Sequence, residues 1–437
     1  MFANSSQVAP VSGRAWGIAI GTVVVVATPA MLVSAKTVQA FLPMLLLLAG
    51  AGALSRGRWR VMIPPLNVAT VFIAALLFFA LISAFWAARP EAVLLMVMVG
   101  VVIAWGSIVT MQALAAETYG NVLHIAEGLW IGFLVGLAYA LLEVVSDQSI
   151  KIWVYNALGL GPEQLEPDRF FTWEGGRLVA VHPDDLKRNL MPVPLLLWPA
   201  LIATRTIVSR LGRYAVGAGL VAMALASVFL SPSHTCKLAL FVGLVVFACS
   251  VYLPRASRVG LTVAWLVACL AVVPIVIQLR ALELQNAEWL QLSGQLRIVI
   301  WNEIAQLVSD APFFGVGADM TYFTQPPLRD VPDVAPGWLG FPIPHPHNVY
   351  LQTWYELGLV GAVLLAGLGT AVLTLISAAS ALARPYLYAV FAAAAVEIGT
   401  SYNLWQIWFL CLFGFAAAMC SLAVNLTRSP CCAVENR

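Results

Sequence analysis

The chain has 437 residues, of which 61% are hydrophobic and only 10% are charged. A soluble globular protein carries about 25% charged residues, so this composition excludes an ordinary soluble protein and a disordered chain. The 23 Lys and Arg residues nearly balance the 21 Asp and Glu residues, and a net charge of +2 is too small for a nucleic-acid-binding surface. Repeated long apolar runs instead predict a single transmembrane domain, residues 1–437, with inserted loops.

Twelve apolar runs are candidates for helices that cross a bilayer, which takes about 20 mostly apolar residues. The first run follows Arg14 and looks like a signal peptide, but it is long for one and a second run follows at once, so we expect a retained signal anchor. The runs that begin at Leu190 and Tyr386 are short, and we expect them to be kinked or buried against other helices. The runs are Trp16–Ser34, Val38–Leu54, Leu66–Trp86, Glu91–Gln112, Asn121–Val145, Leu190–Ala203, Tyr214–Ser231, Cys236–Leu253, Val259–Gln278, Val349–Ala378, Tyr386–Gly399 and Leu404–Leu426. The sequence therefore predicts an all-α polytopic membrane protein with about 12 transmembrane helices.

Basic residues in the connections predict the orientation, because Lys and Arg are enriched in short cytoplasmic loops. With the N-terminus inside, the short outer connections hold only Lys36, Arg89 and Lys237. The inner segments hold Arg14, Arg56, Arg58, Arg60, Arg205, Arg210, Arg213, Arg255, Arg258, Arg384, Arg428 and Arg437. Both termini are therefore expected in the cytoplasm.

This topology leaves two long outer segments, residues 146–189 and 279–347. They contain most of the acidic residues and three of the five histidines, so we expect the chemistry of the protein on this outer side. No pair of cysteines is placed to form an outer disulfide, so packing must hold these segments. Within the second segment, residues 288–310 show helical spacing of apolar side chains and predict an amphipathic helix lying on the outer membrane surface. Its polar side would be formed by Gln291, Gln295, Asn302, Gln306 and Ser309.

Two histidines and an asparagine stand where the tenth apolar run begins. A proline-rich stretch, residues 326–346, is expected to be extended and to deliver His345, His347 and Asn348 to that point. A neutral imidazole can accept a proton from a hydroxyl group, and Asn348 could hold a ring nitrogen or a substrate hydroxyl. The alternative is an interfacial helix cap with exposed histidines. A metal site is not expected, because no further His or Cys lies at ligand spacing.

The same block carries a family resemblance. The run His345-Pro-His347-Asn348-Val-Tyr350-Leu351, with later Glu356, Gly358 and Gly361, resembles the signature of the O-antigen ligase and O-antigen polymerase superfamily. Three upstream elements also resemble the family pattern: Arg297-Ile-Val-Ile-Trp301 followed by Pro312-Phe-Phe-Gly315-Val-Gly317, Ser83-Ala-Phe-Trp86, and Ser231-Pro-Ser233-His234. The last element has His234 where the family has Arg, so Lys237, one turn further on, is expected to take over as anion ligand.

The resemblance implies a glycosyltransferase of the bacterial inner membrane with its active site facing the periplasm. Its donor would be a sugar polymer on undecaprenyl pyrophosphate. A ligase transfers this polymer to the lipid A–core oligosaccharide, whereas a polymerase transfers it to another lipid-linked repeat unit. No cofactor is implied.

The expected chemistry assigns a role to each candidate residue. Arginine binds phosphate bidentately and stays charged, so Arg188, Arg297, Arg280 and Lys237 could stabilise the leaving pyrophosphate in place of a metal ion. His347 would take the proton of the acceptor hydroxyl, with His345 as the reserve base or an orienting group, and Asn348 would orient the acceptor. Direct attack would invert the anomeric centre. A retaining route would need a carboxylate nucleophile, for which the candidates are Glu143, Asp147 and Asp168.

Two alternatives remain at this stage. Polymerases of the superfamily resemble a pattern of paired Arg-x10-Gly elements in two outer loops, of which only Arg329…Gly340 is present. A transporter of lipid-linked glycans, a different class, would need charged residues along a path through the membrane midplane. Glu397 is the main candidate for such a residue within the apolar runs.

Overall fold

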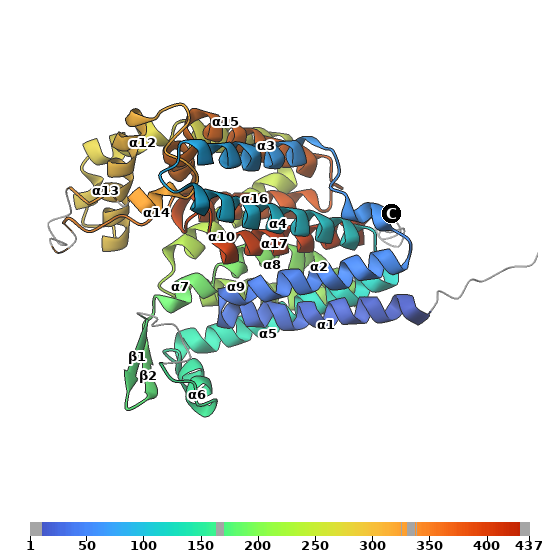
Figure 1. The fold of residues 1–437 in the computed structure, drawn as a ribbon. Coiled ribbons are helices and arrows are strands. Elements are labelled where there is room, and N and C mark those ends of the chain that lie inside the picture. Colours follow the sequence, from blue (N-terminus) through green and yellow to red (C-terminus); the bar gives the residue numbers. More distant parts are fainter. Residues whose placement is uncertain (1–10, 163–169, 325, 330–336, 338, 429–437) are drawn as a thin grey trace, which may run out of the picture.

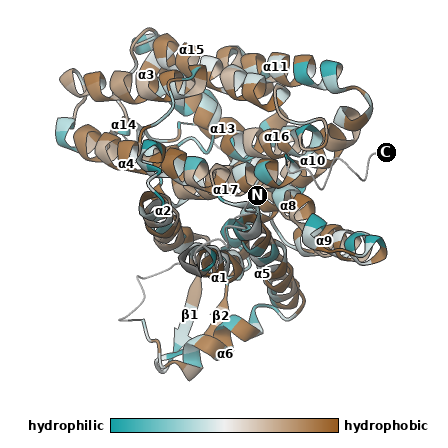
Figure 2. Cartoon of the chain, turned by 90° about the vertical axis from the view of Figure 1, so that its right-hand side faces the viewer, coloured by the Kyte–Doolittle hydropathy of each residue, from teal (hydrophilic) through white to brown (hydrophobic). Residues whose placement is uncertain are grey.

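The protein is a bundle of long helices that carries shorter elements at one end. The computed structural model describes residues 11–162, 170–324, 326–329, 337 and 339–428. Its helices are α1 (Val11–Val33), α2 (Val38–Ser55), α3 (Val68–Ile82), α4 (Pro90–Ala115), α5 (Tyr119–Val145), α6 (Ser149–Ala157), α7 (Asp185–Asn189), α8 (Pro192–Ala203), α9 (Arg210–Leu230), α10 (His234–Tyr252), α11 (Pro254–Leu270), α12 (Val272–Ala281), α13 (Leu292–Leu307), α14 (Met320–Thr324), α15 (Val349–Ser377), α16 (Arg384–Thr400) and α17 (Ile407–Thr427). The strands β1 (Phe171–Glu174) and β2 (Arg177–Val181) form an antiparallel hairpin. Hydrophobic residues prevail along the long helices (Figure 2).

The expected count of twelve membrane-crossing helices is not confirmed by helix length and composition. Within the described residues, nine helices are long and apolar enough to cross a membrane, or ten if α11 and α12 form one broken span. Helices α11 and α12 are bent by 74°, so the prediction of one continuous helix over Val259–Gln278 is wrong. The two runs expected to be short form α8, with 12 residues, and α16, with 17 residues, and neither reaches the length of an independent span. The chain is nonetheless a multi-pass membrane protein.

Helices α1 and α5 approach each other closely because glycines line their contact. Gly128, Gly132 and Gly136 are spaced four residues apart and therefore lie on one face of α5. A Cβ atom on Gly128 would lie 2.5 Å from the Gly21 carbonyl oxygen, and one on Gly132 would lie 2.5 Å from the Val25 carbonyl oxygen. Small residues at such a seam let two backbones meet, which is how membrane helices gain packing energy without a hydrophobic driving force.

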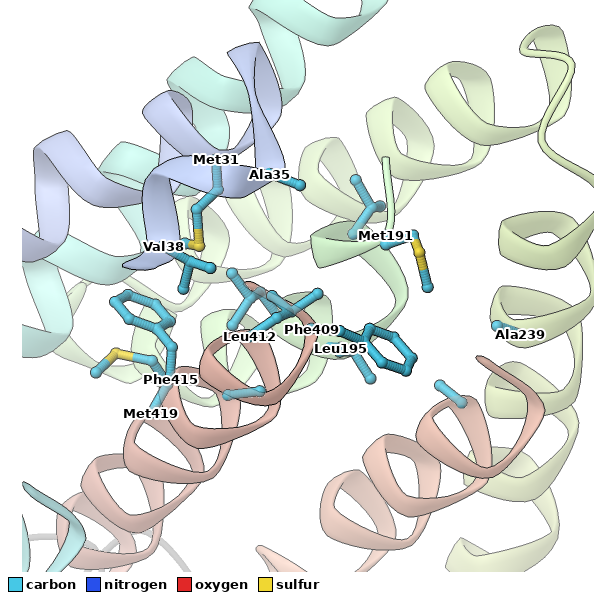
Figure 3. Close-up of a cluster of buried hydrophobic side chains, with 14 of the residues drawn as sticks. Met31, Ala35, Val38, Met191, Leu195, Ala239, Phe409, Leu412, Phe415 and Met419 are labelled. Carbon is cyan, nitrogen blue, oxygen red and sulfur yellow. The ribbon is translucent and has the colours of Figure 1, made fainter. Parts of the chain in front are cut away.

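Helices α8 and α17 form the centre of the bundle. Nearly every residue of α8 is buried, including Trp198 and all three of its prolines. Met191 and Leu195 at the start of α8 lie near Phe409 and Leu412 of α17 (Figure 3). Because other helices surround α8, its short length and its prolines do not expose unsatisfied backbone groups to lipid.

The two ends of the bundle differ in content. Helices α6, α7, α13 and α14 and the hairpin gather at one end of the long helices (Figure 1). At the other end, Asn121 binds the carbonyl oxygen of Gly13, and Arg56 forms an ion pair with Glu117. Asn425, near the end of α17, binds the carbonyl oxygens of Leu114 and Ala115 at this same end. The start of α1 and the end of α17 therefore lie together, opposite the short elements.

Candidate active site

His347 lies just before α15 in a fixed orientation. Its Nδ1 atom lies 2.5 Å from the carbonyl oxygen of Ser401, in the connection between α16 and α17. A carbonyl oxygen only accepts hydrogen bonds, so Nδ1 carries the ring proton and the basic lone pair is on Nε2. The His345 ring packs on His347 with centroids 4.0 Å apart, and both residues are half-buried. His347 has a φ of 55°, a left-handed conformation that is uncommon for a residue other than glycine.

Asn348 has a structural role in addition to any contact with substrate. It is the N-cap of α15, and its side-chain oxygen accepts a hydrogen bond from the Leu351 backbone N–H at 3.1 Å. The cap satisfies one of the free N–H groups at the helix start and therefore fixes where α15 begins relative to His347. The predicted role of Asn348 in orienting the acceptor stays a prediction.

A break in α15 joins this helix to the loop that contains Gly315 and Gly317. Gly358 leaves the helical conformation, with φ of 63° and ψ of −159°. The carbonyl oxygens of Tyr355 and Glu356 consequently accept hydrogen bonds from the loop, from Val316 N at 3.0 Å and Gly317 N at 2.9 Å. After the break, Leu359 N and Val360 N donate to the carbonyl oxygens of Pro312 and Phe313. The contact leaves no room for side chains, because a Cβ atom on Gly315 would lie 2.3 Å from the Glu356 carbonyl carbon.

The early Ser-x-x-Trp element holds the same loop from the other side. The Ser83 hydroxyl oxygen accepts a hydrogen bond from the Ala318 backbone N–H at 2.9 Å. The Trp86 indole N–H donates to the Gly315 carbonyl oxygen at 3.1 Å. Elements that are more than 200 residues apart in the chain thus form one framework around the break in α15.

Glu356 is the buried centre of this framework. Its carboxylate accepts hydrogen bonds from Thr321, Gln352 and Trp405, at 2.7 Å from the Thr321 hydroxyl, 3.0 Å from the Gln352 amide and 2.6 Å from the Trp405 indole. The backbone N–H groups of Asp319 and Thr321 also donate to it. Glu356 is thus bound to the residues that follow Gly317.

Arg188 lies at the end of α7 in a network of charges. Its Nη2 atom donates to Asp185 Oδ1 at 3.0 Å. Asp185 is buried and also binds the Lys151 ammonium group and the Asn189 amide. Asn189 in turn accepts a hydrogen bond from the Ala35 backbone, which ties α7 to the turn between α1 and α2. This network fixes the position of the Arg188 guanidinium group.

Arg297, on α13, has a different environment. It forms no ion pair with any residue in the described part of the chain, and burial lowers the pKa of its guanidinium group from the ordinary value. Both Arg297 and Arg188 act electrostatically on the side chain of Tyr402, which follows Ser401. The two arginines therefore share a region that borders the Ser401 contact of His347.

The start of α10 brings further basic groups to this region. The charges of Lys237, Lys187 and Arg297 all act on His234, which is exposed, whereas Lys237 is half-buried. Thr235 donates a hydrogen bond to the Thr400 carbonyl oxygen, next to Ser401. Arg280 is placed differently, because its charge and that of Arg329 act on Glu303 and oppose the rise in the pKa of Glu303 that burial causes. The structure thus groups Arg188, Arg297 and Lys237, and it links Arg280 to Glu303.

Helix α13 is less amphipathic than its sequence suggests. It begins at Leu292, four residues after the expected start, and two residues of the expected polar face, Gln295 and Asn302, are buried. The Gln295 amide donates to the Ala287 carbonyl oxygen at 3.0 Å, which explains how this side chain is satisfied inside. The prediction that Gln295 and Asn302 face outward is therefore wrong.

Of the carboxylates considered for a retaining route, Glu143 and Asp147 have no contact with His347 among the described residues. Glu143 is buried at the end of α5 and accepts a hydrogen bond from the Lys151 backbone N–H. Asp147 is exposed, and Asp168 lies outside the described residues. Among the residues that the structure describes, no group of three or more His, Cys, Asp or Glu side chains is arranged to hold a metal ion.

Two parts of the site were absent from the sequence-based prediction. One is the Ser401–Tyr402 connection, which contributes a main-chain carbonyl group and thus gives no side-chain signal. The other is Asp185, whose pairing with Lys151 joins residues 34 positions apart. The adjacent pair Asp184-Asp185, close to Arg188, was the signal that could have suggested an ion pair.

The fold and this site define a multi-pass membrane protein with a basic, histidine-bearing site at one end of its helices. Residues 218–366 match the family model of the O-antigen ligase, and this segment includes Arg297, His345, His347 and the break at Gly358. A protein of Rickettsia bellii (strain RML369-C) named "Putative polysaccharide ligase" is 32% identical over 120 residues, which cover 27% of this chain and 29% of that relative. The resemblance to the O-antigen ligase superfamily is thereby confirmed, and the matches support a ligase-type function.

Proposed function

We propose that the protein transfers an O-antigen polysaccharide from undecaprenyl pyrophosphate to the lipid A–core oligosaccharide, at the periplasmic face of the bacterial inner membrane. The observation that carries the proposal is the grouping of an oriented histidine, His347, with two arginines from separate elements. One of these, Arg297, is a half-buried cation without a counter-ion in the described chain. Partial burial withdraws this charge from water, and an anionic ligand such as a pyrophosphate would compensate it.

In this proposal His347 is the general base. The lone pair of Nε2 takes the proton of the acceptor hydroxyl while the hydroxyl oxygen attacks the anomeric carbon. The bond from that carbon to the pyrophosphate oxygen breaks, and its electron pair stays on the pyrophosphate. Attack and departure on opposite faces invert the anomeric centre. His345, packed on His347, orients the acceptor or serves as the reserve base.

Arg188, Arg297 and Lys237 bind the pyrophosphate and stabilise the charge that grows on it. Each charge-assisted contact is worth about 1.5–3 kcal/mol, or roughly a 10- to 150-fold effect on rate if it acts in the transition state. Arg280 is the weakest of the predicted ligands, since its charge is opposed by Glu303. We also propose that α8 and α16 complete twelve crossings with both termini in the cytoplasm, because α1 begins and α17 ends at the same end of the bundle.

The test is transfer by purified protein from undecaprenyl-pyrophosphate glycan to lipid A–core, with EDTA in excess. His347→Asn removes the base but tolerates the left-handed backbone, and we expect it to abolish transfer while it keeps the thermal unfolding midpoint. His347→Ala should agree with it. The matched control is His124→Ala, at the far end of α5, which should keep full activity.

Other outcomes change specific parts of the proposal. Persistent transfer in His347→Asn would shift the base to His345. Elongated lipid-linked glycan without lipid A–core product would instead indicate a polymerase. Loss of wild-type transfer in EDTA, restored by a divalent cation, would overturn the metal-independent role of the arginines.

A further inference from the structure

Tyr402 lies in the part of the site where the proposed general base, His347, is next to the cationic residues Arg188 and Arg297. Tyr402 belongs to the connection between α16 and α17, and the preceding residue, Ser401, supplies the carbonyl oxygen that binds His347 Nδ1. The charges of Arg188 and Arg297, and that of Asp185, the partner of Arg188, act on the Tyr402 side chain. Of two adjacent residues, one thus contacts the base and the other lies within reach of the charges of the two arginines.

The Tyr402 ring is held in place by other aromatic rings. It packs edge-on against Trp408, with centroids 4.8 Å apart and an interplanar angle of 79°, and it contacts Phe409 at 6.0 Å. Trp408 is itself fixed by a hydrogen bond from its indole N–H to Gln406 at 3.0 Å. Aromatic clamping of this kind positions the phenol without using its hydroxyl group.

The hydroxyl group of Tyr402 is not part of this ring packing. Within the described part of the chain, no residue forms a hydrogen bond with it. Tyr402 is half-buried and its hydroxyl oxygen is not closed off from the surface, so a ligand at the site can reach it. Burial raises the pKa of Tyr402, so the phenol stays protonated at neutral pH and can donate a hydrogen bond. A donor beside two guanidinium groups matches an anion with several acceptor oxygens.

We propose that the Tyr402 hydroxyl donates a hydrogen bond to the pyrophosphate of the lipid-linked donor, on an oxygen that gains charge as the glycosidic bond breaks. This inference rests on the proposed function for the identity of the reaction. It adds a catalytic residue that touches the leaving group, and no proton is transferred from Tyr402. The proton of the acceptor goes to His347, and the electron pair of the broken bond stays on the pyrophosphate.

Tyr402→Phe tests the proposal, because it removes the hydroxyl and keeps the ring between Trp408 and Phe409. We expect kcat to fall by about 10- to 150-fold, the size of one charge-assisted hydrogen bond. The acceptor KM and the thermal unfolding midpoint should stay unchanged. The dissociation constant of geranyl pyrophosphate, a short probe with the same leaving group, should rise. The matched control is Tyr386→Phe, a half-buried tyrosine near the opposite end of α16, which should change none of these values.

Three results would overturn the proposal. They are a wild-type kcat in Tyr402→Phe, an unchanged affinity for geranyl pyrophosphate, or a rise in the acceptor KM that accounts for the loss of activity and so assigns Tyr402 to the acceptor sugar. Binding of geranyl pyrophosphate is measured without glycan. If the wild-type protein transfers no glycan, the proposed function fails, and the binding comparison still decides whether Tyr402 contacts a pyrophosphate.

Discussion

Arg188 and Arg297 lie in the same region of the site, but they differ in whether the protein provides a carboxylate partner. Arg188 donates to Asp185, which also binds Lys151 and Asn189, so it has a carboxylate partner that it shares with Lys151. Arg297 is half-buried on α13 and forms no ion pair within the described chain. The difference leads us to expect that the protein itself fixes Arg188, whereas the anionic substrate of the proposed function neutralises Arg297. Activity and stability should therefore respond differently to the loss of each.

Arg297→Met should have the largest effect on activity. It removes the charge and keeps most of the volume, and we expect kcat to fall by up to about 150-fold. The thermal unfolding midpoint of the ligand-free protein should rise, because a half-buried cation without a counter-ion is replaced by an apolar side chain. Steady-state kinetics and thermal unfolding in detergent measure the two effects. Arg297→Lys keeps the charge but cannot bind a phosphate through two parallel N–H groups. Its kcat should therefore lie between those of wild type and Arg297→Met. A fall in both activity and midpoint would show that Arg297 is a structural residue.

Arg188→Met should lower activity less and lower stability as well. We expect a kcat loss nearer to tenfold, because Lys151 and Asn189 still hold Asp185 in place while one phosphate contact is lost. The free energy of unfolding should fall by about 1–3 kcal/mol, since a buried carboxylate loses a donor. Arg177→Met, at an exposed site on β2, is the matched control and should change neither quantity. If Arg188→Met were more stable than wild type, the expected difference in stability between the two arginine variants would be contradicted.

Asp319 should make the stability of the protein depend on pH. Burial and the nearby Glu356 raise the pKa of Asp319 to about 7, from an ordinary value near 3.8. The unfolded chain then releases this proton at a lower pH than the folded protein, so Asp319 lowers stability as pH rises from about 4 to 7. Asp319→Asn should flatten this decline and raise the midpoint by a few degrees at pH 7.5, with no change at pH 4. An unchanged midpoint at both pH values would contradict the shift.

The sequence predicts the parts of the molecule that depend on side-chain chemistry and apolar patterning. The His345–Asn348 block and Arg297 stand out because of their residue types, and the long apolar runs correspond to helices. A contact made by a main-chain group cannot be recognised from residue types. The Ser401 carbonyl group that orients His347 is an example. The bend between α11 and α12 and the burial of Gln295 also depend on tertiary packing, which a single helical pattern does not encode. Likewise, the ion pair of Asp185 and Lys151 arises only when α6 and α7 meet.

The break at Gly358 has a consequence for how this protein tolerates change. Main-chain hydrogen bonds join the loop of residues 312–317 to α15. Val316 and Gly317 donate to α15 before the break, and Leu359 and Val360 of α15 donate to the loop after it. Main-chain groups are the same in every residue other than proline, so this docking is nearly independent of side-chain identity. Phe313 and Phe314, both exposed, should accept many replacements in a saturation library, whereas Gly315 and Gly358 should accept almost none. The side chains of this loop can thus change while its glycines are kept, and the loop stays bound to α15.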